Sequence, residues 1–116
     1  MERIPVSVHE KRLRQMRCVI SAHTEVTLHH THGGSMLILD LDLPNPGMAQ
    51  RNNPFLQIPI HAQYHTGEYG VDTGMGKFKS VEQWEEAFGS QVSFLHEVNA
   101  QLPYDLWQQA RRWAEP

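Results

Sequence analysis

The chain has 116 residues, which predicts a single domain, 1–116, with a core of its own. Its composition, 40% hydrophobic and 20% charged, excludes a disordered or fibrous protein, and its single cysteine excludes a disulfide framework within the chain. The formal net charge of −3 is unlike that of most nucleic-acid-binding proteins. No apolar run approaches the roughly 20 residues of a membrane span, and the N-terminus lacks the apolar stretch of a secretory signal, so we expect a cytoplasmic protein.

The first segment, 1–17, is basic. Five Lys or Arg and two Glu lie in residues 1–20, which gives this part a charge of +3 on an otherwise acidic chain. Residues 9–17 predict a short helix that can contact phosphate groups, and a solvated helix face is the alternative interpretation. The candidate DNA-binding residues here are Lys11, Arg12, Arg14 and Arg17.

Residues 24–79 carry the predicted strands. Residues 25–28 alternate polar and apolar side chains, as a half-buried strand does, and run directly into His29 and His30 and then a Gly-Gly turn. Residues 36–43 predict an edge strand. Residues 55–60 predict a second core strand, which Pro59 places at an edge or at the end of the strand, and a short helix follows from 61.

Residues 80–116 predict a helical tail after a glycine-rich loop over 66–79. Ser80 and Gln83 fit a capping box for a helix that stops at Gly89, residues 91–99 predict a second helix, and Pro103 opens a third. The aromatic residues recur at helical spacing, which indicates core packing rather than base stacking: Trp84, Phe88, Trp107 and Trp113. The expected fold class is therefore α+β.

The eight histidines are the exceptional feature, since histidine in excess suggests metal binding or proton transfer. On a helix, His61 and His65 lie on one face and can bind one metal ion, with His29 as a third ligand from the strand. His30 then serves as a general base. A single His pair on a helix is usually not a metal site, so this hypothesis depends on the combined pattern. His9 and His96 have no partner in the sequence and are expected on the surface.

The pattern of His29-His30, Asn52-Asn53 and His61-Ala-Gln-Tyr-His65 resembles the HNH, or ββα-metal, nucleases. The resemblance implies a ββα-metal fold in which His29, His61 and His65 hold the ion and His30 activates water. It also implies that Asn52 or Asn53 orients the His30 ring.

A closer resemblance, over roughly residues 15–98, is to the phage recombination-enhancement nucleases, the RecA-dependent branch of that superfamily. It is carried by Cys18, the two histidine clusters, Ile58-Pro59-Ile60-His61 and the Trp84–Gly89 stretch. His61 stands where that branch usually has Cys, and Asp72 where it often has His. Two ligand schemes therefore stay open. In one, His29, His61 and His65 share a catalytic ion; in the other, Cys18 and His61, with His23, hold a structural zinc, and His65 joins His29.

The resemblance implies a metal-dependent DNA endonuclease of low sequence specificity that acts in phage DNA recombination. Its expected cofactor is a divalent ion, Mg or Mn for turnover with Zn or Ni as possible bound metals, and its expected partners are DNA and a RecA-type recombinase filament. Arg51 is a further candidate DNA contact, and Asp72 a further candidate metal ligand. The alternative is a zinc-stabilised module of the same fold that binds DNA or protein without catalysis.

Overall fold

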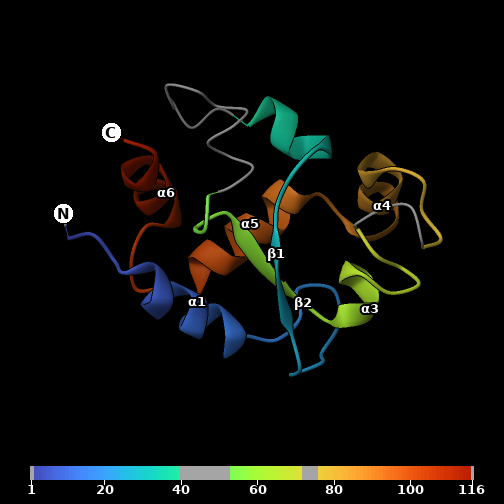
Figure 1. Ribbon diagram of the computed structural model, residues 1–116, viewed down its shortest axis with the longest axis horizontal. Coiled ribbons are helices and arrows are strands. Elements are labelled where there is room, and N and C mark those ends of the chain that lie inside the picture. The colour runs from blue at the N-terminus through green and yellow to red at the C-terminus, as the bar shows by residue number, and fades with distance from the viewer. Residues whose placement is uncertain (1, 40–52, 72–75, 116) are drawn as a thin grey trace.

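The computed structural model describes residues 2–39, 53–71 and 76–115 (Figure 1). Two strands and several helices make an α+β domain. In chain order the elements are α1 (Val6–Arg14), β1 (Thr27–His30), η1 (Gly34–Ile38), β2 (Gln57–Ile60), α3 (Ala62–His65), α4 (Val81–Phe88), α5 (Gln91–Ala100) and α6 (Leu106–Ala114).

The two strands form the centre of the molecule. β1 pairs antiparallel with β2, with Thr27 opposite Ile60 and His30 opposite Gln57. Every residue of β2 is buried, and α5 packs against it. Figure 1 shows the N-terminal segment, α1 and α6 on one side of the two strands and α3 and α4 on the other. The candidate chemistry of the histidine clusters therefore lies away from the chain termini.

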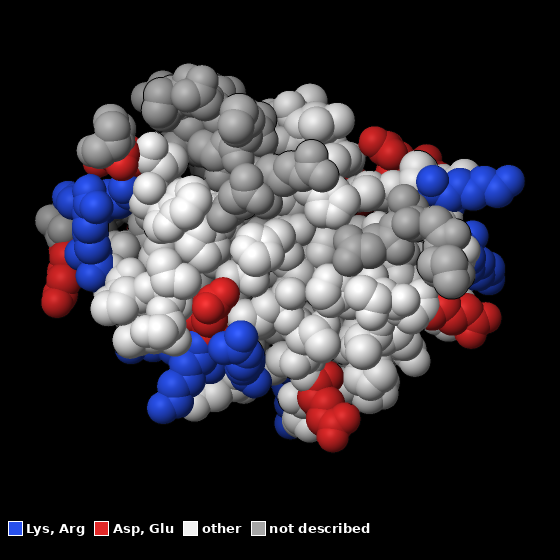
Figure 2. All heavy atoms as spheres, in the orientation of Figure 1, with Lys and Arg blue, Asp and Glu red and all other residues white. Residues whose placement is uncertain are grey.

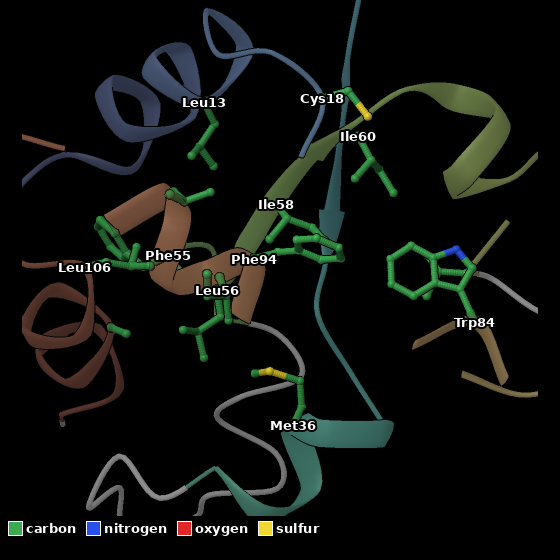
Figure 3. Close-up of a cluster of buried hydrophobic side chains, with 14 residues drawn as sticks. Leu13, Cys18, Met36, Phe55, Leu56, Ile58, Ile60, Trp84, Phe94 and Leu106 are labelled. Carbon is green, nitrogen blue, oxygen red and sulfur yellow. The ribbon is translucent and has the colours of Figure 1, made fainter. Parts of the chain in front are cut away.

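The apolar core runs along the whole molecule beneath the sheet. In Figure 3, Ile58 of β2 and Phe94 of α5 lie together in the middle, while Trp84 closes one end and Leu106 the other. Burying one such large apolar side chain contributes about 1.5–3 kcal/mol. The buried hydrophobic residues are Leu13, Cys18, Met36, Phe55, Leu56, Ile58, Ile60, Val71, Trp84, Phe94, Leu95, Val98, Leu106 and Ala110.

Much of the predicted secondary structure is confirmed. The strands lie within or beside the predicted ranges, the Ser80 hydroxyl accepts the Gln83 amide at the start of α4, and Gly89 ends that helix with a φ of 129°. The helix predicted over 91–99 is α5. These features depend on local alternation and on local capping bonds, which is why the sequence reveals them.

Three predicted elements need correction. The edge strand predicted over 36–43 is wrong where the structure describes it, because Gly33 and Gly34, with φ of 63° and 48°, turn the chain into η1; residues 40–43 lie outside the described residues. The last helix does not open at Pro103 but after Asp105, whose carboxylate accepts the Trp107 amide. The N-terminal helix spans Val6–Arg14 rather than 9–17.

No helix in the described part of the chain is long and apolar enough to cross a lipid bilayer.

The prediction of a surface position for His9 is wrong. Its side chain is fully buried, its ring packs on Phe55 with centroids 4.7 Å apart, and its Nδ1 lies 2.7 Å from the Tyr104 hydroxyl. Within the described residues its Nε2 has no hydrogen-bond partner. Burial, which penalises the charged imidazolium, lowers the pKa of His9 to about 4.

This burial predicts acid sensitivity of the fold. The unfolded chain binds a proton at His9 with a pKa of 6.5, whereas the folded protein binds it at about 4, so the unfolded state takes up more protons between these values. The stability contributed by neutral His9 is complete above pH 6.5 and falls by about 3 kcal/mol as the pH drops to 4. Urea unfolding at a series of pH values measures this dependence of the unfolding free energy on pH.

The matched variant is His9→Gln, which keeps a hydrogen-bonding group beside Tyr104 and cannot titrate. We expect its unfolding free energy to depend less on pH between 6.5 and 4 than that of the parent. His96→Gln, at an exposed histidine, is the control and should keep the parental slope. Equal slopes for the parent and His9→Gln would show that His9 is not the responsible group.

Candidate metal centre

Strand alternation separates the two histidines of the His29-His30 pair. Successive side chains of a strand point to opposite faces, so Thr27 and His29 share one face of β1 while His30 faces the other way. His29 is 1% exposed, and His30 is exposed at the end of the strand. The structure therefore does not bring both imidazoles to one buried point.

His29, which is buried, and His65, which is half-buried, come together beside β1. Their ring centroids lie 5.1 Å apart in an edge-to-face arrangement, and the ring of His32 lies 5.3 Å from that of His29. His65 is the last residue of α3, and this short helix follows β2 directly after His61. The antiparallel pairing of β1 with β2 thus carries His65 back to the strand that holds His29.

The buried side chain of Gln91 fixes the tautomer of His29. The Gln91 Oε1 accepts the His32 backbone N–H at 3.2 Å, and its Nε2 donates to the His32 carbonyl at 2.8 Å, so the orientation of the amide is set by the backbone. The His29 Nε2 lies 2.9 Å from that same Oε1 and must donate to it. The lone pair of neutral His29 is consequently on Nδ1.

Thr27 fixes the opposite tautomer in His65. Its hydroxyl donates to the Ile60 carbonyl at 3.0 Å, so its oxygen can only accept from the His65 Nδ1 at 2.9 Å. The lone pair of neutral His65 is therefore on Nε2. Each ring has one nitrogen committed to an orienting hydrogen bond, which is a common feature of metal-ligating histidines.

The ligand type of this pair suits a divalent transition metal, because imidazole nitrogen is a common ligand of Zn, Ni and related metals. In the ranges 2–39, 53–71 and 76–115, however, no group of three or more His, Cys, Asp or Glu side chains is arranged to hold a metal ion. Asp72, the further ligand predicted from the sequence, lies outside the described residues. The pair of His29 and His65 is accordingly the core of a candidate centre.

His61 does not stand on one helix face with His65. It is the N-cap of α3, with a ψ of 146°, and its Nδ1 accepts the Gln63 amide at 3.2 Å. Its ring packs against His23 with centroids 4.3 Å apart. The i, i+4 prediction is wrong here, because the helix begins only at Ala62.

Cys18 joins His23 and His61 in a second group. The Cys18 Sγ accepts the His61 backbone N–H at 3.3 Å, and the Cys18 backbone N–H donates to the His23 carbonyl at 2.9 Å. Burial raises the pKa of the Cys18 thiol, but hydrogen bonds from the Ser21 side chain and from the backbone of His61, Ile20 and Ser21 outweigh it and lower the pKa overall. A thiol shifted in this direction is a better metal ligand.

The structure uses Asn53 otherwise than the sequence predicts. Its buried side chain donates from Nδ2 to the Ala110 carbonyl at 2.8 Å and accepts the Phe55 amide on Oδ1 at 3.0 Å. The side-chain amide therefore joins α6 to the segment just before β2, so Asn53 does not orient the His30 ring. Asn52, the other candidate for that role, lies outside the described residues.

The basic residues predicted to contact DNA lie on and just after α1. Lys11, Arg14 and Arg17 are exposed, and Arg12 is half-buried with its guanidinium 5.2 Å from the centre of the Tyr104 ring. Figure 2 shows Lys and Arg gathered over α1, with an acidic group among them, and again over α6 and the N-terminal segment. Arg51 lies outside the described residues.

Sequence reasoning missed the residues that orient the histidines, Gln91 and Thr27, and also the nearby ring of His32. The alternation of β1 signals Thr27, because it stands two residues before His29 on the same face. Gln91 begins a helix 62 residues after His29 and carries no local signal.

Comparison of the chain with protein-family models, curated proteins and solved structures found no match.

The tautomers provide a direct test. In metal-free protein, long-range proton–nitrogen NMR spectra should show His65 protonated on Nδ1 and His29 on Nε2. Thr27→Val removes the hydroxyl at nearly constant volume, and we expect it to shift His65 toward the Nε2-protonated form while His29 keeps its tautomer. Thr24→Val, at an exposed position, is the control. An unchanged His65 spectrum in Thr27→Val would contradict the assignment.

Proposed function

We propose that the protein is a divalent-metal-dependent DNA endonuclease of the HNH type. The observation that carries the proposal is the meeting of His29 and His65, with ring centroids 5.1 Å apart and complementary tautomers fixed by Gln91 and Thr27. The order of β1, β2 and α3 agrees with a ββα-metal unit, in which two antiparallel strands precede a helix that bears a ligand.

In this proposal His29 and His65 hold the ion through Nδ1 and Nε2. A bound divalent ion would act as a Lewis acid on a phosphate oxygen and stabilise the charge that develops during hydrolysis. Mg or Mn would support turnover, while the imidazole ligands also suit Zn and Ni.

His30 is the candidate general base. It is exposed as the last residue of β1, on the face opposite to His29, so this role requires its ring to reach past the end of the strand toward the ion. A histidine in this role contributes roughly 10²–10⁴-fold to the rate. The basic residues of α1 and the turn after it supply phosphate contacts without base readout, which agrees with low sequence specificity.

A nicking assay on supercoiled plasmid tests the proposal. With Mg²⁺ or Mn²⁺ we expect cleavage by the parent, a 10²–10⁴-fold loss in His30→Ala, and full loss in His65→Ala. Metal titration should separate the two variants, since His30→Ala keeps the bound metal and His65→Ala does not. His96→Ala, at an exposed histidine, should cleave like the parent.

Cleavage by His30→Ala at the parental rate would overturn its assignment as the base. The nuclease branch that this sequence resembles depends on a recombinase. Each reaction is therefore repeated with a RecA-type filament on single-stranded DNA. Absence of metal-dependent cleavage in both settings would overturn the enzymatic proposal.

A second candidate function, a zinc-stabilised binding module, is favoured by the group of Cys18, His23 and His61. The ring contact between His23 and His61 and the hydrogen bond from the His61 backbone amide to the Cys18 Sγ bring three residues of the zinc-ligand type near the start of α3. Among the described residues their side chains are not arranged to hold an ion, so this function requires them to rearrange around the metal. This group can coexist with the pair of His29 and His65, because the two groups share no residue.

A zinc ion in this group would stabilise the folded chain. We expect zinc-loaded protein to lose several degrees of melting temperature in EDTA. Cys18→Ser should bind less zinc and show little change in melting temperature on chelation. Differential scanning fluorimetry and metal analysis measure both effects, and an equal response of parent and Cys18→Ser to EDTA would exclude Cys18 as a ligand.

A further inference from the structure

A pocket on the other side of the two strands from α3 combines apolar and cationic groups. It has a volume of about 220 Å³ and lies between the N-terminal segment and α6. We call it the terminal pocket and define it by Arg3, Ile4, Phe55, Arg112 and Trp113, which are among the residues that line it. Neither candidate metal group lies in this pocket.

Gln109 builds one wall of the terminal pocket in advance of any ligand. Its side chain, 2% exposed, accepts the Ile4 backbone N–H at 2.9 Å and donates to the Glu2 carbonyl at 2.9 Å. The backbone on both sides of Arg3 is thereby fixed to α6. A wall held in this way binds a ligand without the cost of ordering a loose segment.

Trp113 does not pack as its helical spacing predicts. Leu106 and Ala110 of the same helix are fully buried, whereas Trp113 remains 42% exposed at the edge of the terminal pocket. An exposed indole beside a pocket offers a large rigid surface that a second ring can cover. Phe55, 3% exposed, contributes an aromatic ring to the same pocket.

The charge of the terminal pocket is opposite to that of the whole chain. Among the described residues that line it are two arginines and no carboxylate, although the chain carries a net charge of −3. Figure 2 shows basic side chains gathered over α6 and the N-terminal segment, with acidic groups at the margins. A ligand for this pocket should therefore carry a negative charge next to a flat apolar group.

We propose that the terminal pocket binds one unpaired nucleotide of a single-stranded nucleic acid. The base stacks on the Trp113 indole, and the guanidinium groups of Arg3 and Arg112 contact its phosphate. The volume is below the 300–1,000 Å³ of pockets for drug-sized ligands and suits a single ring system. A base within a duplex is stacked on both sides and is excluded.

This inference deepens the proposed function, because it adds an unpaired strand to the DNA that the protein recognises. The terminal pocket lies between the N-terminal segment and α6, and Figure 1 shows these elements on the other side of the strands from α3, which carries His65. A DNA with a single-stranded region next to a duplex can therefore contact both sides.

Fluorescence anisotropy of a short labelled oligo(dT), with the full chain in EDTA, tests the inference without cleavage. We expect Trp113→Ala and Arg112→Gln each to raise Kd about tenfold. Arg111→Gln is the matched control, since it removes the same charge from the neighbouring position of α6 but does not line the pocket; we expect less than about a twofold change. Trp113→Phe, which keeps a ring, should retain most of the affinity.

Three outcomes would overturn the inference. If Arg111→Gln and Arg112→Gln lose the same amount of affinity for oligo(dT), the binding comes from general electrostatic attraction of the strand rather than from the pocket. Equal affinity for an abasic strand or for duplex DNA would exclude base stacking. Binding of an acidic tyrosine-containing peptide, without binding of oligo(dT), would assign the pocket to a protein partner.

The test remains valid if one variant is unstable or if the proposed function fails. If Trp113→Ala does not fold by circular dichroism, the arginine pair and the abasic strand still decide the outcome. Because binding is measured in EDTA, a protein that binds oligo(dT) but does not cleave DNA, with or without the recombinase filament, refutes the nuclease proposal alone, and the converse result refutes the pocket alone.

Discussion

The buried amide of Gln91 is the interaction on which the candidate centre depends. It pairs with both backbone groups of His32 and with the His29 ring, and so joins the start of α5 to the end of β1. Glu85 supports it from α4, because its carboxylate accepts the Gln91 and Ser35 backbone amides. One carboxylate and one amide thus connect α4, η1, α5 and β1. Buried polar groups of this kind are costly unless every partner is present, so they fix a single arrangement.

The same connections explain the shape of the chain around the centre. At Gly34 the φ of 48° favours glycine, and a Cβ would push the Glu85 carboxylate away from the Ser35 and Gln91 amides. Thr27 and His29 share one face of β1, and the register of β1 with β2 sets where α3 begins and hence where His65 lies. A shift of one residue in that register would turn His29 outward and His30 inward. Both histidine tautomers are therefore consequences of strand pairing and of two orienting side chains.

The structure contains three separate groups of side chains that are candidates for function. His29 and His65 form the candidate catalytic pair, Cys18, His23 and His61 the candidate zinc group, and the terminal pocket lies on the other side of the strands near α6. In the structure the His61 ring packs against that of His23, and the His65 ring packs against that of His29. Separate groups allow a structural role and a chemical role in one small domain, because neither has to share its ligands.

The sequence by itself determined the elements whose signals are local. The alternation before His29, the Ser80 cap and the stop at Gly89 need only neighbouring residues, and each is found in the structure. Tertiary structure alone decided where the distant side chains meet. His9 is buried by Phe55 and Tyr104, Asn53 binds Ala110 rather than His30, and Trp113 stays exposed beside Arg3. Each of these outcomes depends on partners from 46 to 110 residues away along the chain, and no periodicity or cap records such contacts.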